Sequence, residues 1–184
     1  YMKCSDDYLF FAGPQRSRMV VASTKDGSLA WTHPTGTLQL VLREDGIWAA
    51  GPQQSENGMK LDYASGKVLE TFPARRACTR ATGCADSIFY RANGGTVRVL
   101  TESNTAQHFD PMRPPCHDGV IISEGSLYWG PWMCGCQLSL YGHICLTSGA
   151  TFDYQPGIDD SRRTLLATDG SIKPLETKPG DWPT

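Results

Sequence analysis

A pattern of about forty residues occurs four times in this chain and limits the possible folds more than any other feature. Each copy opens with a short aromatic or β-branched run that follows Asp or Gly and precedes a turn containing Gly, Pro or Asn. The runs are DDYLFFAGP, DGIWAAGP, DSIFYRAN and GSLYWGP, which end at Pro14, Pro52, Asn93 and Pro131 with spacings of 38, 41 and 38 residues. A run of this kind between turns indicates a β-strand.

Two further strand-like segments follow each run and are separated by a tight turn. In the first copy they are RMVVAST and SLAWTHP, on either side of the turn at 25–27. A fourth segment lies between copies, as in TLQLVLRED after the first copy and GVIISEG before the last. No segment shows the 3.6-residue periodicity of a helix. We therefore predict an all-β chain with about four blades of four short antiparallel strands, centred on residues 8–31, 47–72, 87–109 and 126–152.

Burial gives a physical reason for the repetition. One four-stranded sheet cannot cover both of its apolar faces, so neighbouring sheets must stack on it. A β-sandwich also uses short strands and frequent turns, but it has no reason to repeat a sequence pattern every forty residues or so. The pattern therefore favours a β-propeller.

The turn chemistry adds a resemblance to a known family. The segment VVASTKDGSLAWTHP resembles the tryptophan-docking repeat of pyrroloquinoline-quinone (PQQ) propellers, in which a strand leads through an Asp/Thr-Gly turn to a Trp. Gly27 and Trp31 match the turn glycine and the docking tryptophan. The second copy keeps Gly66 but has Glu70 in place of the tryptophan, and the fourth copy keeps only Gly149.

This resemblance implies that residues 1–155 form part of a larger PQQ-repeat-like propeller, as also seen in the BamB type of outer-membrane assembly lipoprotein. Rings of this family usually have about seven or eight blades, so the remaining blades of the same chain are an expected partner. Residues 156–184 are polar and are expected to form a linker or tail, or the start of a further domain, because the ending GDWPT resembles the opening of a tandem propeller.

The resemblance also raises the chemistry of quinoprotein dehydrogenases. These enzymes hold PQQ over a Trp platform beneath two adjacent cysteines and bind calcium through Glu, Asn and Asp. Here a glycine separates the two cysteines of the CGC segment at 134–136, so they are not adjacent. The aspartates fall on turns, where Asp is common because its side chain hydrogen-bonds to the nearby backbone. No catalytic residue can be assigned by match. We therefore predict a non-catalytic segment that offers a binding surface to a protein or small-molecule ligand. The alternative is part of a PQQ- and calcium-dependent oxidoreductase acting on alcohols or sugars.

The fourth copy contains an enlarged loop rich in cysteine. Between the Gly-Pro turn and the next strand it has eleven residues, against four, six and two in the other copies. Enlarged loops on a repeat scaffold often carry binding function. Trp132 and Met133 are therefore candidate binding residues, and Cys116 and His117, which open the preceding strand, are expected nearby.

Three structures remain open for this loop. A disulfide clasp would join Cys134 or Cys136 to Cys145 or Cys116, which would restrain the loop. A zinc or copper site would gather Cys134, Cys136, His143 and Cys145, although C-x-C is not the usual spacing of structural zinc. Inert thiols could instead pack with the neighbouring aromatic and apolar side chains.

The segment PARRACTRATGC places Arg75, Arg76 and Arg80 around Cys78 and Cys84. Guanidinium groups suit carboxylate or phosphate, so the three arginines are candidates for an anion-binding rim. A solvated basic loop is the alternative. The two cysteines are candidates for a second disulfide.

Composition restricts location and partners. The formal net charge of −2, with aromatic residues that alternate with apolar ones, predicts no nucleic-acid binding. No apolar run is long enough to span a bilayer. Seven cysteines suit an oxidising compartment, so we expect an extracytoplasmic location, in the periplasm or cell envelope.

Overall fold

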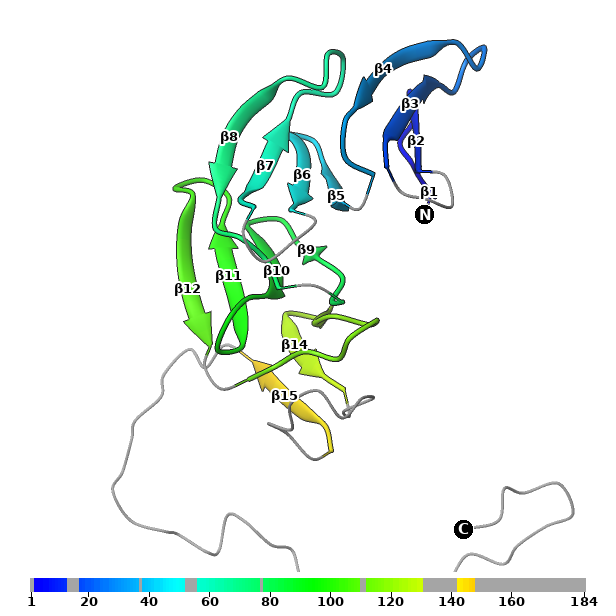
Figure 1. The fold of residues 1–184 in the computed structure, drawn as a ribbon. Helices are drawn as coiled ribbons and strands as arrows, with labels where there is room; N and C mark the ends of the chain where they lie inside the picture. Colours follow the sequence, from blue (N-terminus) through cyan, green and yellow to red (C-terminus); the bar gives the residue numbers. More distant parts are fainter. Residues whose placement is uncertain are drawn as a thin grey trace, which may run out of the picture. The chain divides into compact units, whose positions relative to one another are not determined.

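The computed structural model describes residues 2–12, 17–36, 38–51, 56–76, 78–109, 112–130 and 142–147. The chain divides into two compact units, Tyr1–Ser148 and Gly149–Thr184, and every described residue belongs to the first. The described residues form four antiparallel sheets (Figure 1). They contain no helix, and therefore none long and apolar enough to cross a membrane.

The first two sheets have four strands each, in sequence order. The first sheet contains β1 (Met2–Cys4), β2 (Tyr8–Ala12), β3 (Met19–Ser23) and β4 (Leu29–His33). The second contains β5 (Gln39–Arg43), β6 (Gly46–Ala50), β7 (Gly58–Leu61) and β8 (Val68–Phe72).

The other two sheets continue the same order. The third contains β9 (Thr82–Gly83), β10 (Ser87–Arg91), β11 (Thr96–Leu100) and β12 (Thr105–Phe109). The fourth contains β13 (Ile121–Ser123), β14 (Ser126–Trp129) and β15 (Ile144–Thr147). The segment ATFDYQP, expected as its last strand, lies outside the described residues.

The prediction of four blade-like antiparallel sheets is confirmed, and the structure settles where each sheet begins. The aromatic runs form β2, β6, β10 and β14, which are the second strands of their sheets. The segment between the first two copies forms β5 and belongs to the sheet that follows it. The sequence pattern had not assigned β1 or β9 to any strand.

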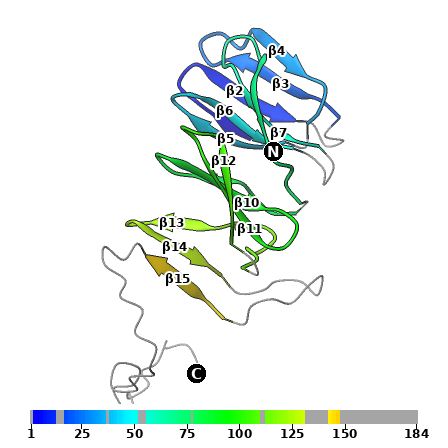
Figure 2. The ribbon, with the colours of Figure 1, turned by 90° about the vertical axis from the view of Figure 1, so that its left-hand side faces the viewer.

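Aromatic and aliphatic side chains fill the layers between successive sheets. Ile47 and Trp48 are adjacent in β6 and fully buried, yet they belong to different layers because neighbouring side chains in a strand point to opposite faces. Ile47 packs with Phe10 of the first sheet, whereas Trp48 packs with Ile88 of the third. Figures 1 and 2 show the four sheets following one another along the chain. Both faces of the second sheet are thus covered, as the burial argument requires.

The tryptophan of the first repeat packs against the turn of the next sheet. Trp31 of β4 is 8% exposed, and its indole Nε1 donates a hydrogen bond to the Tyr63 carbonyl at 2.8 Å. A Cβ atom on Gly66, whose φ is +67°, would lie 2.4 Å from the Trp31 ring. Gly27 lies in the corresponding turn of the first sheet with φ +73°, and Gly149 lies outside the described residues.

Candidate functional site

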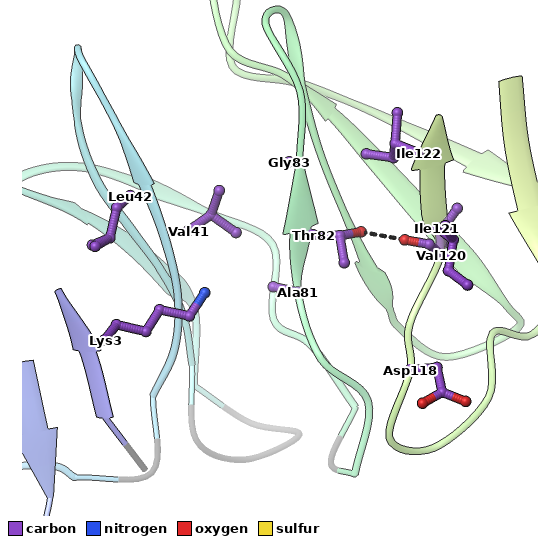
Figure 3. A pocket seen from close by; sticks show the side chains of 10 residues that line it. All are labelled: Lys3, Val41, Leu42, Ala81, Thr82, Gly83, Asp118, Val120, Ile121 and Ile122. Atoms are coloured by element: carbon purple, nitrogen blue, oxygen red, sulfur yellow. Dashed lines mark hydrogen bonds between the residues drawn. The ribbon is translucent and has the colours of Figure 1, made fainter. Parts of the chain in front are cut away.

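The first strand of each sheet places one residue at an equivalent position, opposite the aromatic residue of the second strand. The four pairs are Lys3 with Phe10, Val41 with Trp48, Thr82 with Phe89, and Ile121 with Tyr128. All four first-strand residues line one cleft of about 500 Å³ (Figure 3). The repeat therefore brings one residue from each sheet to a common site, as expected of sheets arranged around a central channel.

Seven of the ten residues that line the cleft are apolar, and the other three, Lys3, Thr82 and Asp118, are polar or charged. The lining residues are Lys3, Val41, Leu42, Ala81, Thr82, Gly83, Asp118, Val120, Ile121 and Ile122. Ile121, a large aliphatic residue of this wall, is 51% exposed. A concave apolar surface with a few polar groups is the usual character of a ligand site.

Lys3 supplies the positive charge at one side of the cleft. Its ammonium group donates a hydrogen bond to the Leu40 carbonyl. Burial, and to a smaller extent the positive charge of Arg80, lowers the pKa of Lys3 below its ordinary value. Of the ion pairs that the described residues form, none includes Lys3 or Arg80. Figure 3 shows the Lys3 amino group directed into the space between β5 and β9.

Close contacts join the strands that form the rest of the wall. The Thr82 hydroxyl donates a hydrogen bond to the Val120 carbonyl at 2.8 Å, which ties β9 to the segment before β13. A Cβ atom on Gly83 would lie 2.5 Å from Val41 Cγ1, so only glycine allows β9 to approach β5 this closely. The cleft wall is therefore a continuous packed surface of several sheets.

A repeated polar cluster lies beside the cleft and fixes the turn between the first two strands. In the second sheet, Asp45 accepts hydrogen bonds from Arg43 at 2.8 Å and from the Trp48 indole at 3.3 Å. Lys60 lies 3.1 Å from Asp45 and 5.2 Å from the centre of the Trp48 ring. Burial opposes ionisation of Asp45, but the hydrogen bonds from Arg43 and Lys60 outweigh it, so the pKa of Asp45 lies below its ordinary value.

The third sheet repeats this arrangement with different residues. Arg98 lies 3.1 Å from Asp86 and over the Phe89 ring, 6.0 Å from its centre. The hydrogen bond from Cys84, followed by that from Ser87, lowers the pKa of Asp86. These clusters stabilise the turns that hold the first strands in position, and they contact no residue that suggests a chemical step. Sequence reasoning missed them.

The three arginines expected at one rim have different environments. Arg75 is buried, with 4% of its surface exposed, and its guanidinium donates to the Arg76 carbonyl at 3.5 Å. The Arg76 main-chain N–H donates to the Arg91 carbonyl. Arg80 is exposed and immediately precedes the strand segment that lines the cleft. Of the three, Arg80 is the one next in sequence to a residue that lines the cleft, and the shared anion-binding rim remains a prediction.

The cysteines have varied environments. Cys78 and Cys84 both have free thiols, so the expected bridge between them is not formed. Cys116 is buried, and its sulfur accepts a hydrogen bond from the Arg113 guanidinium at 3.4 Å. Cys145 is exposed with a free thiol.

The enlarged loop with Trp132, Met133, Cys134 and Cys136 lies outside the described residues, so the metal site and a clasp to Cys116 remain predictions, whereas the free thiol of Cys145 does not support a clasp at that residue. His117 and His143 are exposed. Within the described ranges, no group of three or more metal-ligating side chains comes together. The extracytoplasmic location likewise remains a prediction.

The described residues do not fit the PQQ and calcium site that the resemblance raises. Trp31, Trp48 and Trp129 are all buried between sheets, so none of them offers a platform to the cleft. The single acid among the lining residues is Asp118. No step of quinone chemistry is therefore derived from them.

Comparison with known structures supports the fold. The sequence matches no protein-family model and no curated protein. The structure is similar to the computationally designed propeller Ika8, with a TM-score of 0.52 and 11% identity over 70% of this chain and 41% of that one. It also matches BamB from Moraxella catarrhalis, with a TM-score of 0.49 and 10% identity over 67% of this chain and 39% of that one.

A third match is KlHsv2 with loop 6CD replaced by a Gly-Ser linker, with a TM-score of 0.47 and 9% identity over 70% of this chain and 43% of that one. The chain thus spans about two fifths of the length of the structures it matches. Together with the four stacked sheets, the likeness to the designed protein identifies the fold as a β-propeller. At these identities the comparisons concern the fold alone.

Proposed function

We propose that this chain is a non-catalytic binding module, and that its ligand is held in the cleft lined by the first strands of the four sheets. A propeller fold suggests a binding-surface role, and the cleft gives that role a location. The expected ligand is a small molecule or a short protein segment, because the volume of about 500 Å³ suits a group of that size.

The proposal rests on a comparison of the paired residues in the first and second strands of each sheet. The second-strand residues are of one kind, whereas the first-strand residues in β1, β5, β9 and β13 differ from one another. The residues on the second strands are all aromatic, and Phe10, Trp48 and Phe89 are buried between sheets. Their partners in the cleft are Lys3, Val41, Thr82 and Ile121, which differ in charge, polarity and shape. A repeated scaffold that places different groups around one cleft offers an asymmetric surface able to discriminate between ligands.

The other two functions raised by the sequence gain no support from the described residues. A PQQ-dependent oxidoreductase would need groups that the cleft does not provide. A metal centre would depend on the loop outside the described residues. Neither is proposed here as the function.

Ligand-observed NMR with a library of small neutral and charged fragments tests the proposal. We expect fragments to bind the unaltered chain and to lose binding in Ile121→Lys, which places a charged side chain on the cleft wall. Val68→Lys is the matched control, because Val68 is also 51% exposed, β-branched and in a strand but does not line the cleft. Equal binding by both variants would contradict the proposed site.

A further inference from the structure

The structure assigns a ligand class to the cleft: we propose that it binds a small monoanionic organic acid, with the acidic group at Lys3 and Arg80 and the apolar part against β9 and β13. This inference rests on the proposed binding role of the cleft. It adds the charge and the orientation of the ligand.

The chemistry of Lys3 supports an anionic ligand. Lys3 is the cation among the four equivalent first-strand residues, and its side chain is half-buried. An ammonium group has three donors, of which the Leu40 carbonyl takes one. Partial burial of a cation is unfavourable unless a counter-charge compensates it. A carboxylate at this position would accept the remaining donors and provide that counter-charge.

Arg80 strengthens the same preference. It directly precedes Ala81 of the cleft wall, its positive charge adds to the effect of burial in lowering the pKa of Lys3, and it takes part in none of the ion pairs found in the described part of the chain. Two neighbouring cations repel each other, and an anion between them would relieve the repulsion. A guanidinium group also suits a carboxylate geometrically.

Asp118 sets the number of charges that the ligand should carry. Figure 3 shows Asp118 on the turn before β13, on the side of the cleft away from Lys3. Lys3 and Asp118 are the charged residues that line the cleft, and Arg80, next to the lining residue Ala81, adds one further positive charge. A second acidic group on the ligand would approach Asp118 and be repelled, so a monoanion fits better than a dianion.

The wall between Lys3 and Asp118 would hold the apolar part of the ligand. Ala81, Val120 and Ile121 form this part of the cleft, and Ile121 is half-exposed. The Thr82 hydroxyl already donates to the Val120 carbonyl, so a ligand does not need to accept a hydrogen bond from that hydroxyl. Covering Ile121 with an alkyl chain would remove apolar surface from water, which favours binding.

Isothermal titration of the 184-residue chain with octanoate and with octanol tests the proposal, because these probes share a tail and differ in charge. We expect octanoate to bind about tenfold more tightly than octanol, which corresponds to one charge-assisted hydrogen bond. Lys3→Met should abolish this preference, so that octanoate binds no more tightly than octanol. Lys25→Met, which removes an exposed lysine of the same sheet, should preserve it.

Arg80→Gln provides a second test if Lys3→Met does not fold, because Arg80 is exposed. It should weaken octanoate binding about threefold or more, and by a larger factor than it changes octanol binding. Equal affinities of the unaltered chain for the two probes, or octanoate binding that withstands loss of either cation, would overturn the proposal. Binding of neutral fragments in the cleft would then still support the proposed function. Failure of octanoate to bind would also overturn the proposal, and failure of every fragment as well would overturn both.

Discussion

Gly27 and Gly66 occupy equivalent turns of the first two sheets, and replacing each with alanine isolates the contribution of the Trp31 contact. Both glycines have φ near +70° and lie between the third and fourth strands of their sheets. An alanine in this left-handed region costs about 1–2 kcal/mol at either position. A Cβ on Gly27 would meet nothing within 4 Å, whereas a Cβ on Gly66 would lie 2.4 Å from the Trp31 ring.

The steric term should therefore appear in one variant and not in the other. At Gly66 the Trp31 ring must move by roughly 1 Å to restore a normal contact of about 3.5 Å. Such overpacking typically costs about 1–3 kcal/mol, and displacing the indole from the Tyr63 carbonyl adds about 1 kcal/mol. We expect Gly66→Ala to lower the free energy of unfolding by about 3–6 kcal/mol and Gly27→Ala by about 1–2 kcal/mol.

Urea denaturation followed by fluorescence measures this difference. With an m value of about 2 kcal/mol/M, the midpoint of Gly66→Ala should lie about 1 M or more below that of Gly27→Ala. Equal midpoints for the two variants would show that Trp31 does not pack on Gly66. The inference that the first sheet docks on the second through this tryptophan would then be wrong.

Three further results are expected from the described contacts. Because the pKa of Asp45 is lowered in the folded state, its ion pairs stabilise the fold above about pH 4, and this stabilisation is lost as pH falls through the folded-state pKa. The urea midpoint of Asp45→Asn should therefore fall less between pH 7 and pH 3 than that of the unaltered chain. Tyr90→Phe should lower the free energy of unfolding by about 1–2 kcal/mol, because the Tyr90 hydroxyl donates to the Pro73 carbonyl at 2.7 Å; no change in urea midpoint would argue against this hydrogen bond. Native alkylation followed by mass spectrometry should modify exposed Cys78 well before buried Cys116, and the reverse order would contradict their placement.

The strands with a strong local pattern were predictable from the sequence. The aromatic runs, which form β2, β6, β10 and β14, carry large apolar residues on both faces. Each of these strands lies in a sheet that packs against a neighbouring sheet. The turn glycines were also predictable. Gly27 and Gly66 stand at a turn position with positive φ, a backbone conformation that residues with a side chain rarely adopt. These features are local, and a single sequence records them.

The cleft could not be predicted because it depends on the pairing register. Lys3 has no distinctive neighbours, and β9 consists of Thr82 and Gly83, which are too few to give a strand signal. Their equivalence emerges only when each is placed opposite its aromatic partner. Arg80 was recognised as a candidate anion ligand, but it was grouped with Arg75, whose burial the sequence does not indicate.

The polar clusters of the second and third sheets escaped notice for a related reason. Asp45 and Asp86 each precede their aromatic residue by three positions. The cation then follows 12 residues after Trp48 but 9 residues after Phe89, because the intervening hairpin loops differ in length. The spacing between the aromatic residue and the cation therefore differs between the two clusters, and they align only when each cation is placed opposite its aromatic partner on the neighbouring strand.

The central claim is that the first strands of the four sheets form one ligand site, and intermolecular NOEs test it most directly. The chain would be labelled with ¹³C at Ile, Leu and Val methyl groups and mixed with the fragment that binds most tightly. We predict NOEs from the ligand to the methyl groups of Val41 in the second sheet and of Val120 and Ile121 in the fourth sheet and the segment that leads into it. NOEs confined to exposed Leu29 or Val68, which do not line the cleft, would contradict the account.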